Sequence, residues 1–298
     1  MMPTPAFTDK GSLSESRRRG ILLLVGYLAL YAATLLAMNC AGNFDIAEPL
    51  LVLGIVGVGF SLAAWLLTIG VKPLAYTIRQ PQQELTVIAI YLIPVVAFLT
   101  LGLGAIHRYI PADPEDAIAL LIAKSLVLVI VPATMLWRLF GYSFRRLAPM
   151  SLRLRHLIII VVMSALLLGF QAALGSGLRD ILNAHLPAAK LLVGVPLVFA
   201  WLALEAGVVE EFFFRVLLQT RLTAVLRSEL GGIVLMALLF GLAHAPGLYL
   251  RSSLTNEGLG AHPSFLMAVG YSIVVLIHAA GDLLPNLLPM LHSLRLVK

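Results

Sequence analysis

The chain alternates between long apolar stretches and short polar segments. The apolar stretches fall at about residues 20–38, 50–69, 85–106, 117–137, 157–174, 191–209, 231–250 and 265–284. A helix needs about 20 apolar residues to cross the hydrocarbon core, and an isolated strand would leave its backbone unsatisfied in lipid. The pattern therefore predicts an all-α fold, a polytopic transmembrane helical bundle of about eight spans.

The composition favours a membrane protein over a soluble one. Of the 298 residues, 60% are hydrophobic and 12% are charged, whereas soluble domains carry about 25% charged residues. The single cysteine, Cys40, excludes an intrachain disulfide and a cysteine-based metal site. We expect a disordered, polar cytoplasmic tail at residues 1–19 and a single membrane domain over residues 20–298.

The positions of lysine and arginine predict the orientation of the chain. With eight spans and the N-terminus inside, most of these residues fall in cytoplasmic segments, while those on the opposite side are Arg108, Arg179, Lys190 and Arg251. An excess of basic residues is typical of cytoplasmic loops. We therefore expect a multi-pass integral membrane protein with both termini in the cytoplasm. The same asymmetry accounts for the net charge of +6, so no nucleic-acid partner is predicted.

Two ionisable residues lie inside apolar stretches without belonging to a motif. Lys124 lies seven residues into the fourth stretch, and we expect its ammonium group to extend toward the outer face. Glu205 has no such route to water. It either pairs within the bundle or lines a site, and the sequence leaves both interpretations open.

The most unusual polar segment is Glu210-Glu211-Phe212-Phe213-Phe214-Arg215, beside the sixth apolar stretch. On a helix Glu211 and Arg215 share a face, and this order of charges is the favourable one, so we predict an ion pair. Glu210 points about 100° away, and we expect its carboxylate to be unpaired. Such a group in a low-dielectric site binds a proton readily, which suits a general base or acid. The alternative is an ion-pair cluster that only joins helices.

Two further segments place imidazoles in apolar stretches. In Phe240-Gly241-Leu242-Ala243-His244, the phenylalanine and the histidine share a helix face. In His278-Ala279-Ala280-Gly281-Asp282, the same spacing puts a carboxylate beside an imidazole, where it can fix the tautomer of the ring. Each segment alone is also consistent with a hydrogen bond between helices. Together the three segments supply groups for activating water, with or without zinc.

The motifs Glu-Glu-x-x-x-Arg, Phe-x-x-x-His and His-x-x-x-Asp, in this order on successive apolar stretches, resemble the CPBP family of intramembrane endopeptidases. That family includes the CAAX prenyl proteases and bacterial Abi and bacteriocin-processing relatives. The resemblance covers about residues 191–284, which we take as the catalytic region. It implies an all-helical enzyme of the bacterial cytoplasmic membrane, with a membrane-associated or lipidated protein or peptide as substrate.

The resemblance also implies a role for each motif residue. Glu210 and His244 would activate the attacking water, and His278 and Asp282 would stabilise the developing oxyanion. The family often has asparagine at the last position, and an ionised Asp282 cannot donate a hydrogen bond. Orienting His278 is therefore the role that we prefer for Asp282. The supporting residues implied by the resemblance are Glu211 and Arg215.

The requirement for a cofactor is left open by the sequence. The family has been described both as glutamate-type and as metal-dependent. The candidate ligands for a divalent metal such as zinc are Glu210, His244 and His278, with water in the fourth position. We favour the metal-free mechanism, because the resemblance gives His278 a role separate from water activation.

Two other classes of function are weighed against the endopeptidase. A non-proteolytic membrane immunity or interaction protein on the same fold would tolerate loss of Glu210. A proton-coupled transporter would use Glu205, Glu210 and the histidines, but transporters show internal symmetry, and no repeat is evident in the sequence. We predict an intramembrane endopeptidase, with the interaction protein as the alternative.

The charge asymmetry leads to a test of topology. Reporter fusions at Arg146 and at Lys298 should both indicate a cytoplasmic location, because both positions lie on the lysine- and arginine-rich side of the membrane. A periplasmic signal from either fusion would contradict the eight-span topology.

Overall fold

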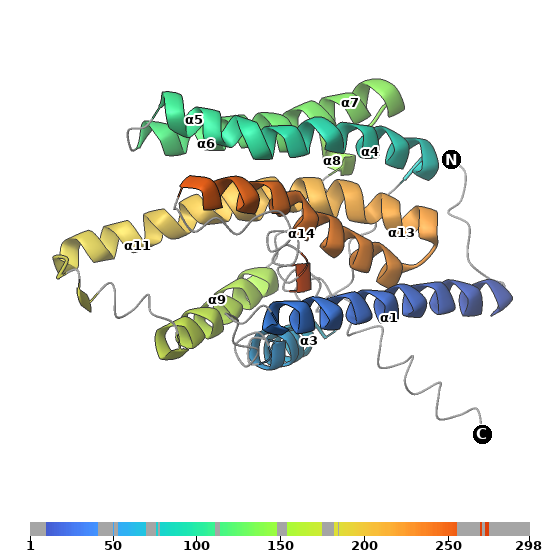
Figure 1. The fold of residues 1–298 in the computed structure, drawn as a ribbon, viewed down its shortest axis with the longest axis horizontal. Coiled ribbons are helices and arrows are strands. Elements are labelled where there is room, and N and C mark those ends of the chain that lie inside the picture. The colour runs from blue at the N-terminus through green and yellow to red at the C-terminus, as the bar shows by residue number, and fades with distance from the viewer. Residues whose placement is uncertain are drawn as a thin grey trace.

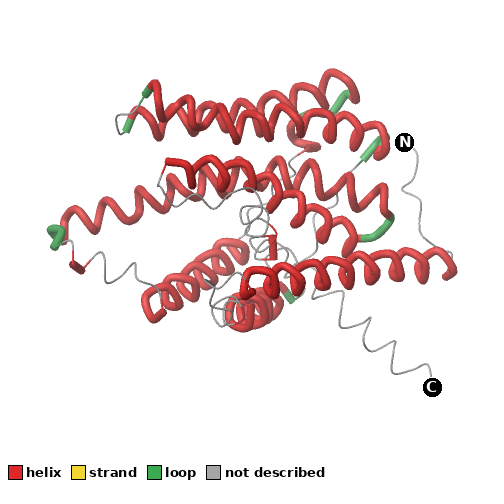
Figure 2. Tube along the Cα trace, in the orientation of Figure 1, coloured by secondary structure: helices red, strands yellow, loops and turns green. Residues whose placement is uncertain are grey.

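The helical architecture predicted from the apolar stretches is confirmed. The computed structural model describes residues 10–40, 50, 53–69, 76, 78–110, 114–147, 154–174, 182–183, 185–254, 269 and 272–273. These residues form helices joined by turns, with no strand among them (Figure 2). Among them are four helices long and apolar enough to cross a membrane: Glu15–Cys40, Pro81–Tyr109, Glu115–Phe140 and Ala188–Leu226. Shorter apolar helices cover Val58–Thr68, Leu157–Phe170 and Glu229–Ala245.

The described elements follow the predicted stretches in order, with π-helical segments, labelled η, inside several of them. The first part of the chain contains α1 (Lys10–Cys40), η1 (Leu53–Phe60), α3 (Ser61–Thr68), α4 (Pro81–Ala97), η2 (Phe98–Gly102) and α5 (Leu103–Tyr109). The middle part contains α6 (Glu115–Ser125), η3 (Leu126–Ile130), α7 (Val131–Phe140), α8 (Phe144–Leu147) and α9 (Leu154–Leu174). The last part contains α11 (Ala188–Leu202), η4 (Ala203–Val208), α12 (Val209–Glu211), η5 (Phe212–Gln219), α13 (Thr220–Leu226) and α14 (Glu229–Leu254).

Two helices extend beyond the predicted stretches. The helix α1 begins at Lys10, inside the segment 1–19 that we predicted as a polar tail. An ion pair between Glu15 and Arg19, one helical turn apart, supports the helix there. The sixth apolar stretch continues as one helix to Leu226 instead of ending near residue 209. It can continue through a charged segment because the charges in it have partners, as described below.

The helices are arranged in three layers (Figure 1). In that view α4 to α7 form the upper layer, α11 to α13 form the middle layer together with α14, and α1, α3 and α9 form the lower layer. The middle helices pack on both sides, since α13 contacts α4 and α14 contacts α1. The glutamate pair and His244 all belong to this middle layer, so neighbouring helices cover the elements that carry them.

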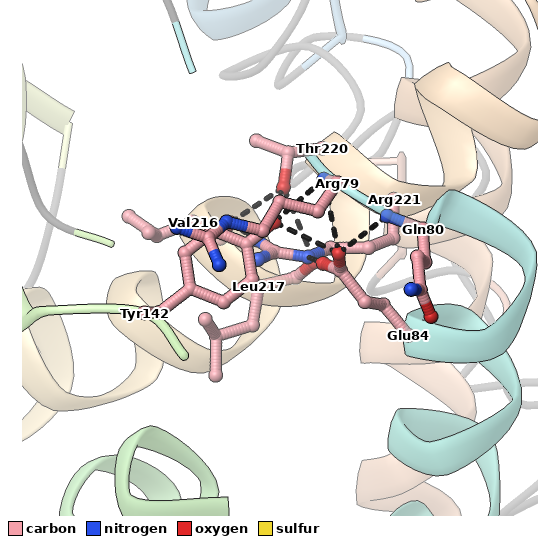
Figure 3. A network of polar contacts seen from close by, with 8 residues as sticks. All are labelled: Arg79, Gln80, Glu84, Tyr142, Val216, Leu217, Thr220 and Arg221. Atoms are coloured by element: carbon pink, nitrogen blue, oxygen red, sulfur yellow. Dashed lines mark hydrogen bonds and ion pairs between the residues drawn. The ribbon is translucent and has the colours of Figure 1, made fainter. Parts of the chain in front are cut away.

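A buried charge network fixes α13 to α4 and to the turn after α7 (Figure 3). Glu84 and Arg221 are 0% and 2% exposed, and Arg221 Nε lies 3.0 Å from Glu84 Oε2. The other carboxylate oxygen, Oε1, accepts from the Tyr142 hydroxyl at 2.8 Å and from the backbone N–H groups of Arg79 and Gln80 at 3.1 Å and 2.9 Å. Glu84 therefore also accepts from backbone donors at the start of α4, where the first N–H groups of a helix have no partner within the helix.

The remaining polar groups of this network are also satisfied. Arg221 Nη1 donates to the Val216 carbonyl and to Thr220 Oγ1, both at 3.0 Å. Burial raises the pKa of Tyr142 to about 12, so its hydroxyl stays protonated and can donate. Counting basic residues along the sequence places Arg221 on the cytoplasmic side, and the structure adds that its guanidinium group is buried between helices.

The network leads to a stability prediction. Arg221→Met leaves the Glu84 carboxylate buried without its counter-charge, so the free energy of unfolding should fall by about 3–5 kcal/mol. Glu84→Gln combined with Arg221→Met should recover part of this loss, because neither charge remains. Thermal unfolding in detergent measures both effects.

The control for this experiment is Arg138→Met, which removes an exposed arginine from α7. Surface substitutions usually change stability by about 0.5 kcal/mol or less. An Arg221→Met variant as stable as this control would show that the buried pair does not hold the helices together.

Candidate active site

Glu210 and Glu211 lie in α12, a short α-helical turn between the π-helical segments η4 and η5. The hydrogen bonds of a π-helix run from residue i to i+5, and such segments are frequent at functional sites. The sequence gives no direct signal for them, because an amphipathic pattern is read with the α-helical period. The π-helical segments η4 and η5 determine which side chains of this helix share a face.

The predicted ion pair between Glu211 and Arg215 is confirmed. Arg215 Nε lies 2.7 Å from Glu211 Oε2. The Arg215 side chain is 20% exposed and that of Glu211 is 44% exposed, so the pair lies at the margin of the packed region. The supporting role that the resemblance gives to these residues stays a prediction.

Glu210 is paired, and the prediction of an unpaired carboxylate is wrong. Lys124 Nζ lies 3.1 Å from Glu210 Oε1 and 2.9 Å from Glu205 Oε1. The ammonium group is directed at these two carboxylates, so the predicted extension of Lys124 toward the outer face is also wrong.

Glu205 reaches this cluster because of the register of η4. Residues five apart on an α-helix point about 140° away from each other, whereas i→i+5 hydrogen bonding brings them to neighbouring positions. Glu205 and Glu210 are five apart, with Glu205 inside η4 and Glu210 two residues beyond its end. Both carboxylates therefore face Lys124. Of the two interpretations of Glu205 left open above, pairing within the bundle is confirmed, and a role in a site stays a prediction.

A chain of aromatic rings joins the glutamate-bearing helix to His244. Phe213 and Phe214 of η5 are in edge contact at 5.2 Å between ring centroids, and Phe214 meets Phe240 of α14 at 4.7 Å. The Phe240 ring lies 4.8 Å from the imidazole of His244. Such pairs contribute about 0.5–1.5 kcal/mol beyond the burial of their surface. The Phe-x-x-x-His motif thus contains both the imidazole and the ring that holds it against η5.

The hydrogen bond of His244 identifies its tautomer. Nδ1 lies 2.8 Å from the carbonyl oxygen of Phe240. A carbonyl oxygen only accepts hydrogen bonds, so Nδ1 carries a proton. In the neutral ring Nε2 then holds the lone pair and is the nitrogen that can accept a proton. A backbone carbonyl in this position also fixes the orientation of the ring.

The third motif lies outside the described residues, so the positions of His278 and Asp282 are not part of the structure described. Within the same apolar stretch, Ser272 is 0% exposed and its hydroxyl donates to the Val269 carbonyl at 2.6 Å. Tyr27 of α1 therefore supplies the proton of the 2.8 Å hydrogen bond that joins it to Ser272. This contact ties the eighth apolar stretch to α1, which also packs on α14.

The described residues do not fit a metal site at Glu210. Its Oε1 lies beside the ammonium group of Lys124, whose charge would oppose a divalent cation at the same oxygen. In the part of the chain that the structure describes, no group of three or more histidine, cysteine, aspartate or glutamate residues can hold a metal ion. Because the third candidate ligand, His278, lies outside that part, we derive no step through a metal.

Sequence reasoning missed the partnership of Lys124 with Glu205 and Glu210. A signal for it does exist: a lone ammonium and a lone carboxylate in separate apolar stretches are each costly to bury. Two such groups of opposite charge at similar depth predict each other as partners. The spacing rules used along one helix cannot find this pair, because 86 positions separate Lys124 from Glu210.

Comparison with known protein families finds a match for the segment that contains the site. Residues 192–289 match the family model described as Type II CAAX prenyl endopeptidase Rce1-like. This confirms the resemblance to the CAAX-type endopeptidases over the three motifs. The match and the apolar helices together indicate an integral membrane protein with a protease-type domain. No curated protein and no solved structure matches the chain.

The aromatic chain can be tested through stability. Phe214 is 2% exposed and stands between two other rings, so Phe214→Ala should lower the free energy of unfolding by about 3–5 kcal/mol. Phe199→Ala in α11 is the matched control, since that ring is 53% exposed. Thermal unfolding in the same detergent compares the two variants. Equal losses would mean that the aromatic chain contributes nothing beyond ordinary apolar surface.

Proposed function

We propose that this protein is an intramembrane endopeptidase that hydrolyses a peptide bond of a membrane-associated or lipidated protein, using water activated by Glu210 and His244. One observation carries the proposal. The endopeptidase family match at residues 192–289 covers the segment in which Phe214 and Phe240 hold the first two motifs together. The description of the family makes a prenylated peptide the first substrate to test.

The chemistry assigned to these residues is general base catalysis. As the oxygen of a water molecule attacks the carbonyl carbon, the proton that it loses passes to the Glu210 carboxylate. His244, with its lone pair on Nε2, accepts a hydrogen bond from the same water and orients it. When the C–N bond breaks, the proton passes on to the leaving nitrogen. A base positioned in this way contributes about 10²–10⁴ in rate.

The third motif would act on the other side of the reacting carbonyl. We assign stabilisation of the oxyanion to His278, where removing one donor costs about 10²–10³ in rate. Asp282 would orient the ring of His278, since an ionised carboxylate has no proton to donate. The Glu211–Arg215 pair would hold α12 and η5 in place. The resemblance to the CAAX-type family implies a catalytic centre that opens toward the cytoplasmic side, so we propose cleavage in or near the cytoplasmic half of the bilayer.

The central test is Glu210→Gln in purified protein reconstituted into liposomes, assayed with a farnesylated peptide that ends in a CAAX sequence. The rate of cleavage should fall by about 10²–10⁴, because glutamine keeps the shape and cannot accept the proton. Thermal stability should stay near that of the wild type, because Lys124 keeps its contact with Glu205 at 2.9 Å.

The control is Glu115→Gln, which alters an exposed glutamate at the start of α6 and should leave the rate unchanged. If Glu210→Gln cleaves the peptide as fast as the control does, Glu210 is not the base. Full biological function without cleavage would instead favour a protein that acts by binding.

A further inference from the structure

Lys124, Glu205 and Glu210, which we call the charge triad, come from three different elements: α6, η4 and α12. Their side chains are 12%, 20% and 18% exposed. Lys124 lies outside the residues that match the endopeptidase family and outside all three motifs. The motifs and the family match therefore assign no role to this lysine or to its contact with Glu205.

The charge count of the triad does not suit a purely structural role. One ammonium group and one carboxylate form a neutral pair, and that is enough to join two helices. The second carboxylate gives the triad a net charge of −1, which is costly in a low-dielectric environment. Joining two helices therefore does not require the second glutamate.

The position of Lys124 is itself fixed by neighbouring elements. It stands at the end of α6, immediately before η3. Three residues further along, the Val127 carbonyl of η3 accepts a hydrogen bond from the Tyr91 hydroxyl of α4 at 2.8 Å. Tyr91 in turn contacts Phe213 of η5, with 6.2 Å between ring centroids. The helix that carries the ammonium group and the helix that carries the two carboxylates are thus held by the same tyrosine.

We propose that Lys124 is a positioning residue for Glu210, and that Glu205 keeps Lys124 from neutralising Glu210. This inference rests on the function proposed above. It identifies Lys124 and Glu205 as the residues that control the orientation and charge of the base. Because the ammonium group holds Oε1 of Glu210 at 3.1 Å, the carboxylate has a fixed orientation. We assign the attacking water to the other oxygen, Oε2.

The second carboxylate explains how Glu210 stays basic beside an ammonium group. A proton moves from water to Oε2 while the water oxygen forms its bond to the carbonyl carbon. The triad then changes from a net charge of −1 to a net charge of zero. Lys124 and Glu205 remain as a neutral pair, so the protonated Glu210 leaves no uncompensated charge behind.

The decisive variant is Glu205→Gln, which leaves a neutral pair between Lys124 and Glu210. A structural role predicts a protein at least as stable as the wild type and fully active. The positioning role predicts that kcat falls by about tenfold or more. This loss is part of the rate acceleration of about 10²–10⁴ that a general base contributes. The positioning role also predicts an unchanged KM, because the loss occurs only in the transition state. Both constants are measured in liposomes with the farnesylated CAAX peptide.

A second pair of variants tests the lysine itself. Lys124→Met alone leaves two carboxylates without a counter-charge and can fail to fold, so it is combined with Glu205→Gln. The double variant should fold and should lose about 10² in kcat, the effect of a misplaced catalytic group. Lys124→Arg should preserve the activity that is lost with methionine at this position, because arginine keeps a positive charge between the carboxylates. Lys190→Met, in the exposed first turn of α11, is the control for loss of a lysine.

The outcomes separate this inference from the function on which it rests. If Glu210→Gln abolishes cleavage while Glu205→Gln and the double variant keep the kcat of the wild type, the charge triad is structural and this inference is overturned. If Glu210→Gln itself cleaves at the wild-type rate, or the wild type leaves the peptide intact, the proposed function is overturned instead.

Discussion

An ionised side chain inside the hydrocarbon core is tolerated only beside its counter-charge, and this constraint decides where the helices of the protein meet. The long helix Ala188–Leu226 is held by charges at two levels. At one level Lys124 of α6 reaches Glu205 and Glu210, and at the other Arg221 pairs with Glu84 of α4. Positions 210 and 221 are about 16 Å apart along the axis. The glutamate-bearing segment is therefore fixed against α6 and α4 of the upper layer.

Apolar contacts hold the long helix in place together with the ion pairs. Charges fix the long helix against α4 and α6, whereas the rings of Phe213, Phe214 and Phe240 fix it against α14. The imidazole of His244 is held at the end of this ring series by Phe240, through the ring contact and through the backbone carbonyl. The carboxylates and the imidazole thus depend on different interactions, so a change in one set need not displace the other.

The parts of this protein that the sequence predicts are those that depend on local spacing. Apolar stretches of span length identified the helices, and the four-residue spacing of Glu211 and Arg215 identified their ion pair. The partners of Glu210 could not be found in this way, because Lys124 lies in another helix. The pairing of Arg221 was missed for a related reason: counting basic residues cannot tell a loop arginine from one paired with a distant Glu84. The catalytic roles came from resemblance to a family, and the physical pattern alone supported several chemistries.

The π-helical register of η4 changes how the site should be recognised in other sequences. In a plain α-helix, two glutamates reach the same face when they are four apart. Across η4 they reach it when they are five apart. Inserting or deleting one residue between the two glutamates can therefore be neutral for the site, provided that the segment changes between α and π geometry. The triad is defined by a helix face rather than by a fixed sequence spacing, so a search with a fixed spacing would overlook chains that place the same groups together.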